Sequence, residues 1–241
     1  MIKKLSIIFP LYNEEKRLNQ TFLEINKFKK KNKNMKLEIL FVNDGSSDKS
    51  AFLINNFIMN NKMKNLKFKD LKLKSNMGKG YALKFGVKRA TMPWILTLDI
   101  DLSVSLFQIT KWESSKFLKK EKIFFGSRNL KNSIVKKSLH RFLLGKLFNF
   151  LVKIILDISL FDTQCGFKLY KRNEAKNIFS KLTNYGFTHD LEIVLLARKK
   201  KIKIKELPVK WLHKSGSKLN ILYDSSKMFL NIFLLKIKYF N

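Results

Sequence analysis

Short apolar runs alternate with longer amphipathic segments through the first half of this chain, and a polar group follows each apolar run. This alternation is typical of β-strand–α-helix–β-strand units on a parallel sheet. It predicts strands near residues 5–9, 37–42, 66–71 and 94–98, with helices near 14–30, 48–60 and 78–90. Ligands of such sheets bind beyond the carboxyl ends of the strands. The polar groups at those ends are therefore the first candidates for a functional site.

Two acids directly after the fourth strand, Asp99 and Asp101, are the most informative of these groups. Carboxylates crowded at one strand end repel each other unless a cation or hydrogen-bond donors neutralise them. Mg²⁺ or Mn²⁺ held together with substrate phosphates would do so. The alternative is that both acids cap the next helix. The pattern alone leaves both interpretations open.

The three earlier strand ends each have a simpler explanation when taken alone. Asn13 suits a helix N-cap, residues 44–48 suit a tight turn, and the glycine-flanked Lys79 lacks the spacing of a P-loop. However, the fold brings all four strand ends to one edge of the sheet. This convergence predicts a nucleotide site there, with Lys79 close to a diphosphate.

The second half of the sequence predicts helices near residues 106–119 and 190–200 and strands near 123–125 and 202–211. Between them, the stretch 140–161 has a polar helical face and a wide apolar one. That apolar face is either buried under the domain or, in the interpretation we prefer, lies in a membrane interface. The tail from 221 to 240 is apolar too, but its longest uncharged stretch, 228–235, falls far below the ~20 residues that spanning needs.

A formal net charge of +32 suggests a polyanionic partner, either an anionic bilayer or nucleic acid. Only six of the 50 basic residues are arginine, while Lys, Asn, Ile and Phe abound. Because their codons are A/T-rich, genome composition explains the charge equally well. The single cysteine, Cys165, excludes an intrachain disulfide, and the three scattered histidines give no zinc-ligand spacing. The N-terminal apolar run is too short for a signal peptide, so we expect a cytoplasmic protein.

Seven motifs make the chain resemble family 2 glycosyltransferases with a GT-A fold, an α/β, Rossmann-like and mainly parallel sheet flanked by helices. The resemblance runs from about residue 5 to about residue 231, and the motifs lie at residues 9–14, 42–48, 76–80, 99–103, 126–128, 162–168 and 216–219. Within the family, residues 162–168 resemble dolichyl-phosphate or polyprenyl-phosphate β-glucosyltransferases. Residues 99–103 resemble the related dolichol-phosphate mannose synthases.

The resemblance implies an inverting enzyme that transfers a hexose, with glucose from UDP-glucose favoured, to a polyprenyl or dolichyl phosphate. The implied donor-binding residues are Pro10, Tyr12, Glu14, Asp44, Gly78, Lys79, Asp99 and Asp101. Of these, Asp99 and Asp101 would hold Mg²⁺ or Mn²⁺. The same fold with GDP-mannose or with a non-lipid glycan acceptor is the close alternative, and a non-catalytic polyanion-binding protein is a remote one.

For the acceptor side, the resemblance implies that Arg128 and Arg141 bind the lipid phosphate, although a headgroup contact fits Arg141 equally well. Asp162 is the first candidate for the acid at the reacting centre, ahead of Asp190 and Glu192, for which a structural role is the alternative.

The expected organisation is a catalytic domain over residues 1–220, followed by an amphipathic tail over 221–241. Residues 1–103 would form the nucleotide-sugar half and residues 104–220 the acceptor half. We expect a peripheral protein on the cytoplasmic face of a membrane, in contact with an anionic surface and without a nucleic-acid partner.

Overall fold

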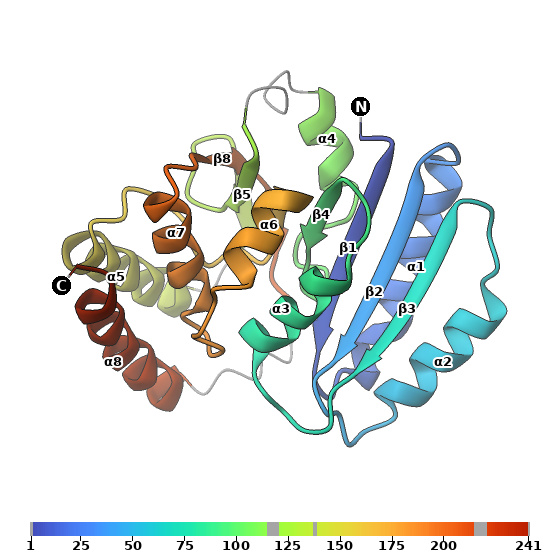
Figure 1. Cartoon of the computed structure of the whole chain (residues 1–241), viewed down its shortest axis with the longest axis horizontal. Coiled ribbons are helices and arrows are strands. Elements are labelled where there is room, and N and C mark those ends of the chain that lie inside the picture. The colour runs from blue at the N-terminus through green and yellow to red at the C-terminus, as the bar shows by residue number, and fades with distance from the viewer. Residues whose placement is uncertain (1, 115–120, 137–138, 215–220, 241) are drawn as a thin grey trace.

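A mixed seven-stranded sheet forms the centre of the protein (Figure 1). The computed structural model describes residues 2–114, 121–136, 139–214 and 221–240. The strand order is β3-β2-β1-β4-β7-β5-β8, and all neighbours are parallel except the two pairs that involve β7. The strands are β1 (Lys4–Leu11), β2 (Lys36–Asn43), β3 (Leu66–Lys72), β4 (Trp94–Thr97), β5 (Ile123–Ser127), β7 (Lys168–Lys171) and β8 (Ile204–Pro208). The α/β architecture expected from the sequence is confirmed.

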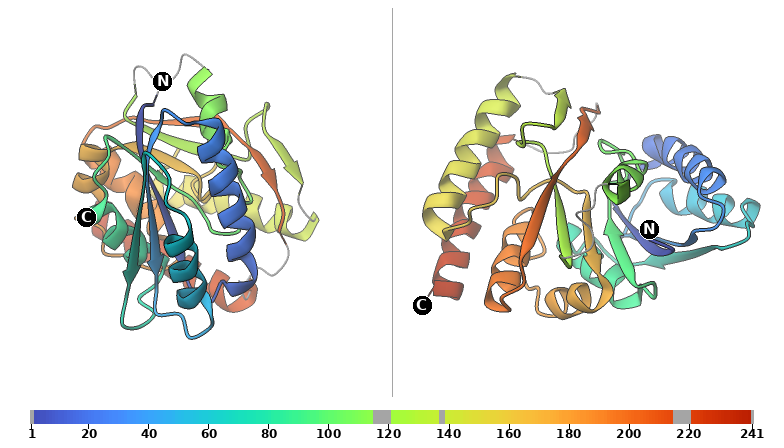
Figure 2. Two further views of the ribbon diagram at one scale, coloured as in Figure 1. Left: turned by 90° about the vertical axis from the view of Figure 1, so that its right-hand side faces the viewer. Right: turned by 90° about the horizontal axis from the view of Figure 1, so that it is seen from above.

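Helices cover both faces of this sheet (Figure 2). A hydrophobic core lies on each face. The first lies under α1 (Glu15–Lys31), α2 (Ser50–Asn60) and α4 (Gln108–Ser114). The second lies under α3 (Lys79–Arg89), α6 (Arg172–Phe179) and α7 (His189–Lys199). Because helices cover both faces, β1 and β2 are buried from their second residue onward, which explains why most of their residues are apolar.

The second half departs from the sequence-based expectation in three places. The predicted strand 202–211 is two strands, because β9 (Lys210–Leu212) leaves the main sheet to pair with β6 (Ile134–Lys136). The sequence analysis did not foresee β6, β7 or α6. The predicted helix 106–119 corresponds to α4, and residues 115–120 lie outside the described part of the chain.

Two amphipathic helices, α5 (Leu139–Leu156) and α8 (Ile221–Phe240), pack against each other at one side of the molecule (Figures 1 and 2). Each contributes to the second core, α5 through Val152 and Leu156 and α8 through Ile232 and Leu235. The apolar surface of α5 is therefore partly buried, although Phe150 and Ile154 remain exposed. Among the described residues, the helices are all too short or too polar to cross a bilayer.

The expected boundary between residues 103 and 104 lies within one continuous sheet, since β4 precedes it and β5, β7 and β8 follow it. The expected tail coincides with α8. Our division into a donor half and an acceptor half stays a prediction.

Candidate active site

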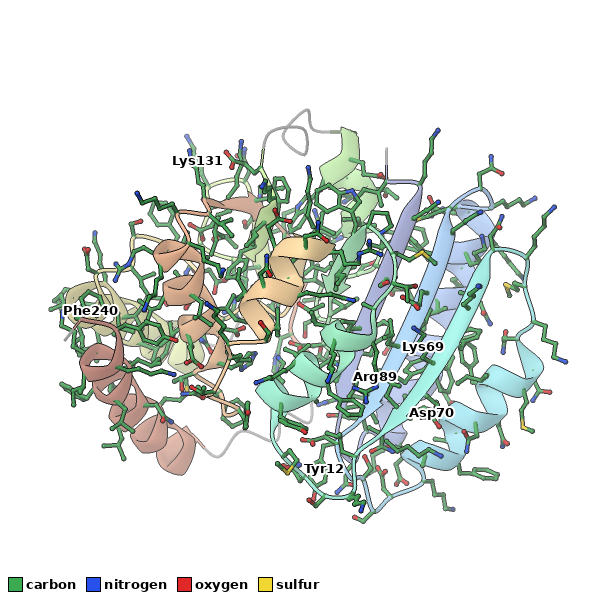
Figure 3. The ribbon with its side chains drawn as sticks, viewed as in Figure 1. Tyr12, Lys69, Asp70, Arg89, Lys131 and Phe240 are labelled. Atoms are coloured by element: carbon green, nitrogen blue, oxygen red, sulfur yellow. The ribbon has the colours of Figure 1, made fainter. Side chains whose placement is uncertain are left out.

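The loops after β1 and β2 interlock at the carboxyl edge of the sheet, where Tyr12 lies (Figure 3). Asn13 adopts a left-handed conformation, with φ of 53°, which asparagine tolerates better than most residues. Its side-chain carbonyl accepts hydrogen bonds from the backbone amides of Ser47 (2.8 Å) and Asp48 (3.3 Å). The backbone amide of Asn13 donates to Ser46 Oγ (2.8 Å). These bonds fix Tyr12 and Asp44 on neighbouring loops.

The glycine-flanked turn after β3 is held against Asp44. This buried carboxylate accepts hydrogen bonds from the amides of Met77 (2.8 Å) and Gly78 (2.9 Å). Gly78 has a φ of 94°, and an added Cβ would lie 2.6 Å from the carbonyl oxygen of Tyr185. Both the conformation and the close approach therefore require glycine. The second and third strand ends thus form one unit.

Lys79 connects this turn to the fourth strand end. Its ammonium lies 2.6 Å from Asp99 Oδ1. Burial alone would lower the pKa of Lys79, but the negative charges of Asp99, Asp190 and Asp101 raise it above its ordinary value. The side chain is therefore positively charged at neutral pH, as its predicted place beside a diphosphate requires.

Asp99 and Asp101 leave β4 in directions set by their local contacts. Asp101 accepts hydrogen bonds from the backbone amide (2.8 Å) and the hydroxyl (3.0 Å) of Ser103. The Asp99 carboxylate packs so closely on Gly166 that an added Cβ there would overlap it. Glycine at position 166, which the sequence analysis named only as part of the motif at 162–168, thus leaves room for the Asp99 carboxylate in this position.

The carboxylates of Asp99 and Asp101 suit a divalent cation that is also bound by a substrate. No group of three or more potential ligands among His, Cys, Asp and Glu occurs in the described parts of the chain. Two carboxylates nevertheless suit Mg²⁺ or Mn²⁺, because such ions are commonly held by one or two carboxylates together with substrate phosphates. The metal site stays a prediction.

A buried ion pair between Arg128 and Asp162 lies at the end of β5. Nε and Nη2 of Arg128 donate to the two carboxylate oxygens at 2.6 and 2.8 Å, and the Arg128 amide adds a third bond at 2.9 Å. Burial alone would raise the pKa of Asp162, but the Arg128 guanidinium and these bonds hold it below its ordinary value. The contacts therefore favour Asp162 as the group that orients Arg128.

Asp190, the second residue of α7, forms a second buried ion pair, with Lys168 of β7. His189 Nε2 lies 3.0 Å from the same carboxylate, and Lys168 Nζ also donates to the Thr163 carbonyl (2.9 Å). Burial alone would raise the pKa of Asp190, but His189 and Lys168 hold it well below its ordinary range. A small cavity separates this pair from Lys79 and Asp99, so Asp190 faces the predicted donor site.

The other predicted residues lie in different surroundings. Pro10 lines that same cavity, and the Glu14 carboxylate pairs with Arg17 at 2.9 Å. Glu192 is fully buried and bonded to groups remote from the acidic pair, which favours the structural alternative for it. Arg141 belongs to α5, but its side chain lies outside the described part of the structure.

Sequence reasoning missed two further features of the site. Lys168 belongs to the motif at 162–168, and its place in that motif, at the start of a short strand, was the available signal. The segment 183–186, which packs on the turn around Lys79, carries no sequence signal that would have identified it.

Comparison with known proteins connects this geometry to one enzyme family. The model of glycosyl transferase family 2 matches residues 6–179. Dolichyl-phosphate beta-glucosyltransferase ALG5D of Trichomonas vaginalis is 34% identical, covering 98% of this chain and 73% of that protein. The Homo sapiens dolichyl-phosphate beta-glucosyltransferase is 31% identical, covering 98% and 76%.

Among solved structures, glucosyl-3-phosphoglycerate synthase from Mycobacterium tuberculosis, in complex with Mn²⁺, UDP and glucosyl-3-phosphoglycerate, matches with a TM-score of 0.70. The match covers 97% of this chain and 80% of that one, at 12% sequence identity. At this identity the likeness supports the fold.

Proposed function

The chain belongs to glycosyl transferase family 2, and on that premise we propose that it transfers glucose from UDP-glucose to a polyprenyl or dolichyl phosphate. It is a nucleotide-sugar glycosyltransferase. The choice of sugar and acceptor is supported by relatives named dolichyl-phosphate beta-glucosyltransferase, which match nearly the whole chain. The observation that carries the proposal is the cluster of Asp44, Lys79, Asp99 and Asp101 at one sheet edge.

In this proposal, the turn around Lys79 binds the donor diphosphate. Its ammonium offsets the negative charge that develops on the leaving nucleotide. Asp99 and Asp101 would hold Mg²⁺ or Mn²⁺, which would supply further positive charge to the same leaving group. Pro10, Tyr12, Glu14 and the backbone around Asp44 surround the nucleoside.

Arg128 is our proposed contact for the acceptor phosphate, because a guanidinium binds phosphate oxygens in pairs. A phosphate monoester is already largely ionised at neutral pH, since its second pKa is about 6. It can therefore attack the anomeric carbon, with inversion, without a strong base. This suits a site in which Asp162 and Asp190 are both ion-paired with basic side chains and neither is available as a base. Positioning of the reactants then matters more than proton removal.

The proposed activity is tested by incubating the purified protein with Mn²⁺, radiolabelled UDP-glucose and dolichyl phosphate in detergent. We expect a labelled, charged lipid that is stable to mild base and is absent when dolichol replaces dolichyl phosphate. Labelled GDP-mannose should give far less product. If no nucleotide sugar labels any lipid phosphate, the proposed acceptor is wrong.

We further propose that α5 and α8 rest on an anionic bilayer. Both helices expose apolar side chains, including Phe150 and Ile154 on α5 and Phe233 and Ile237 on α8. Cationic groups surround the exposed end of α8, where Arg198 and Lys236 stack on the ring of Phe240 at 4.7 and 3.8 Å. Figure 3 shows Phe240 at the side of the molecule away from β3. An apolar face bordered by cations matches the surface of a bilayer with anionic headgroups.

Replacing both Phe233 and Ile237 with Glu should weaken binding to phosphatidylserine-containing vesicles by at least about tenfold, since each buried apolar side chain contributes about 1.5–3 kcal/mol. Co-sedimentation with vesicles measures the effect. Phe52→Glu is the matched control, because Phe52 is equally exposed but lies on α2 at the opposite side of the sheet. An equal loss of vesicle binding in Phe52→Glu would show that the exposed face of α8 is not the specific membrane-binding surface.

A further inference from the structure

Glu192 joins the last helix of the chain to the segment beside the donor site. Its carboxylate is completely buried and accepts hydrogen bonds from two groups of α8, Lys238 Nζ (2.6 Å) and Tyr239 Oη (2.9 Å). On its other side, it accepts bonds from the amides of Thr183 (2.9 Å) and Asn184 (2.6 Å) and from the Thr183 hydroxyl (2.8 Å). One side chain thus connects α7, α8 and the segment 183–186.

The segment 183–186 also packs against the turn around Lys79. The Gly80 amide donates to the carbonyl oxygen of Tyr185 at 2.9 Å. An added Cβ on Gly80 would lie 2.7 Å from the Asn184 carbonyl oxygen, and one on Gly78 would lie 2.6 Å from that of Tyr185. With no space between the two backbones, a shift of Asn184 must be accompanied by a shift of the turn.

The turn carries the ammonium that faces the donor site. Lys79 lies between the two glycines, with its Nζ paired to Asp99 at 2.6 Å. The contacts therefore run without a gap from the end of α8, through Glu192 and Asn184, to Lys79. Packed elements of this kind transmit displacements between sites because close-packed interiors do not deform freely.

We propose that Glu192 is a positioning residue that couples the packed position of α8 to the conformation of the turn that binds the donor diphosphate. This inference rests on the proposed function. Glu192 itself cannot touch the substrates, because its oxygens are enclosed and already bonded. It acts on donor affinity through Thr183 and Asn184. Helix α8, which also carries the exposed apolar face, thereby helps to position the donor-binding turn.

The test removes the two α8 groups that bond to Glu192, and with them the direct bond from Lys238 Nζ to the Thr183 hydroxyl (2.5 Å), and leaves the contacts of Glu192 to the segment intact. In the variant Lys238→Met with Tyr239→Phe, we expect the Kd for UDP-glucose in the presence of Mn²⁺ to rise roughly 3- to 30-fold, the range found for mutations along coupled networks. Isothermal titration calorimetry on the full chain measures it. The KM for UDP-glucose should rise in parallel, while the KM for dolichyl phosphate should not change.

The control is Lys199→Met, which removes an exposed charge from the last turn of α7, the helix of Glu192, and none of the groups bonded to Glu192. It should bind UDP-glucose as the wild type does. A second variant, Glu192→Gln, keeps the shape of the side chain but replaces one acceptor oxygen with a donor, which must face either the two backbone amides or the Lys238 ammonium, and it should show the same selective loss. Unchanged donor affinity in both the double variant and Glu192→Gln would overturn the inference. If the wild type itself bound no nucleotide sugar, the proposed function would fail first.

Discussion

Replacing Asp101 with Asn is expected to lower the rate of glucose transfer by about a hundredfold to a thousandfold, a loss typical of removing one electrostatic group from a transition state. Asparagine keeps the shape of the side chain, and its carbonyl oxygen can still accept the bond from the Ser103 amide. The fold should therefore be retained. What is lost is the second negative charge at the end of β4, and with it the proposed affinity for a divalent cation bound with the diphosphate.

Two measurements separate this loss from damage to the fold. Binding of Mn²⁺ in the presence of UDP, measured by calorimetry, should be weakened in Asp101→Asn, whereas its thermal unfolding should resemble that of the wild type. Asp157→Asn is the control, because this side chain is 89% exposed and remote from β4. Full activity in Asp101→Asn would remove the metal assignment from this residue.

Replacing Arg128 with Met is expected to lower the free energy of unfolding by about 3–5 kcal/mol, the cost of leaving a buried charge without its partner. Asp162 is almost fully enclosed and would lose two hydrogen bonds, those from Nε and Nη2 of Arg128, together with their positive charge, while the bond from the backbone amide of residue 128 would remain. Because domains are stable by only about 5–15 kcal/mol in total, the effect should be large in urea titrations. Transfer to dolichyl phosphate should be lost as well.

The double variant Arg128→Met with Asp162→Asn tests whether the buried charge causes the loss. Removing both charges should recover part of the stability, since a buried pair replaced as a whole costs little. Transfer should stay low, because the proposed phosphate contact is absent. A single variant that destabilises by less than about 1 kcal/mol, the range of exposed ion pairs, would contradict the buried pairing.

The same ion pair sets a pH dependence of stability. The pKa of Asp162 is lower in the folded protein than its unfolded value of about 3.9. Its contribution to stability is therefore fully present above about pH 4 and disappears as the pH falls through the folded pKa. The stability difference between the wild type and Arg128→Met should accordingly shrink below pH 4.

The convergence of the strand ends at one sheet edge could be predicted from the sequence because it depends on local patterns. Asp44 follows β2 directly and Asp101 lies in the loop after β4, so the alternation of strands and helices was enough to bring them to one edge. Asp44 nevertheless fixes the turn at Met77 and Gly78 through backbone amides, and no pattern of side chains reveals such bonds.

The acceptor side could not be predicted in the same way, because it depends on how distant segments meet. Arg128 and Asp162 are 34 residues apart, and their pairing requires β7 to run antiparallel beside β5. Lys168 resembles a surface residue in the sequence, since its burial depends on a partner, Asp190, supplied by another helix. For the same reason, Glu192 was grouped with the catalytic candidates although its partners come from α8 and the segment 183–186.

The antiparallel strand β7 also limits the order in which the chain can fold. β7 lies between β4 and β5, although it follows both of them in the sequence. During synthesis from the N-terminus, one edge of β4 therefore remains open until residue 168 has left the ribosome. An open edge invites pairing with other chains. A truncated protein that stops before β7 should consequently be prone to aggregation, and residues 1–103 alone should make a poor soluble fragment for donor-binding studies.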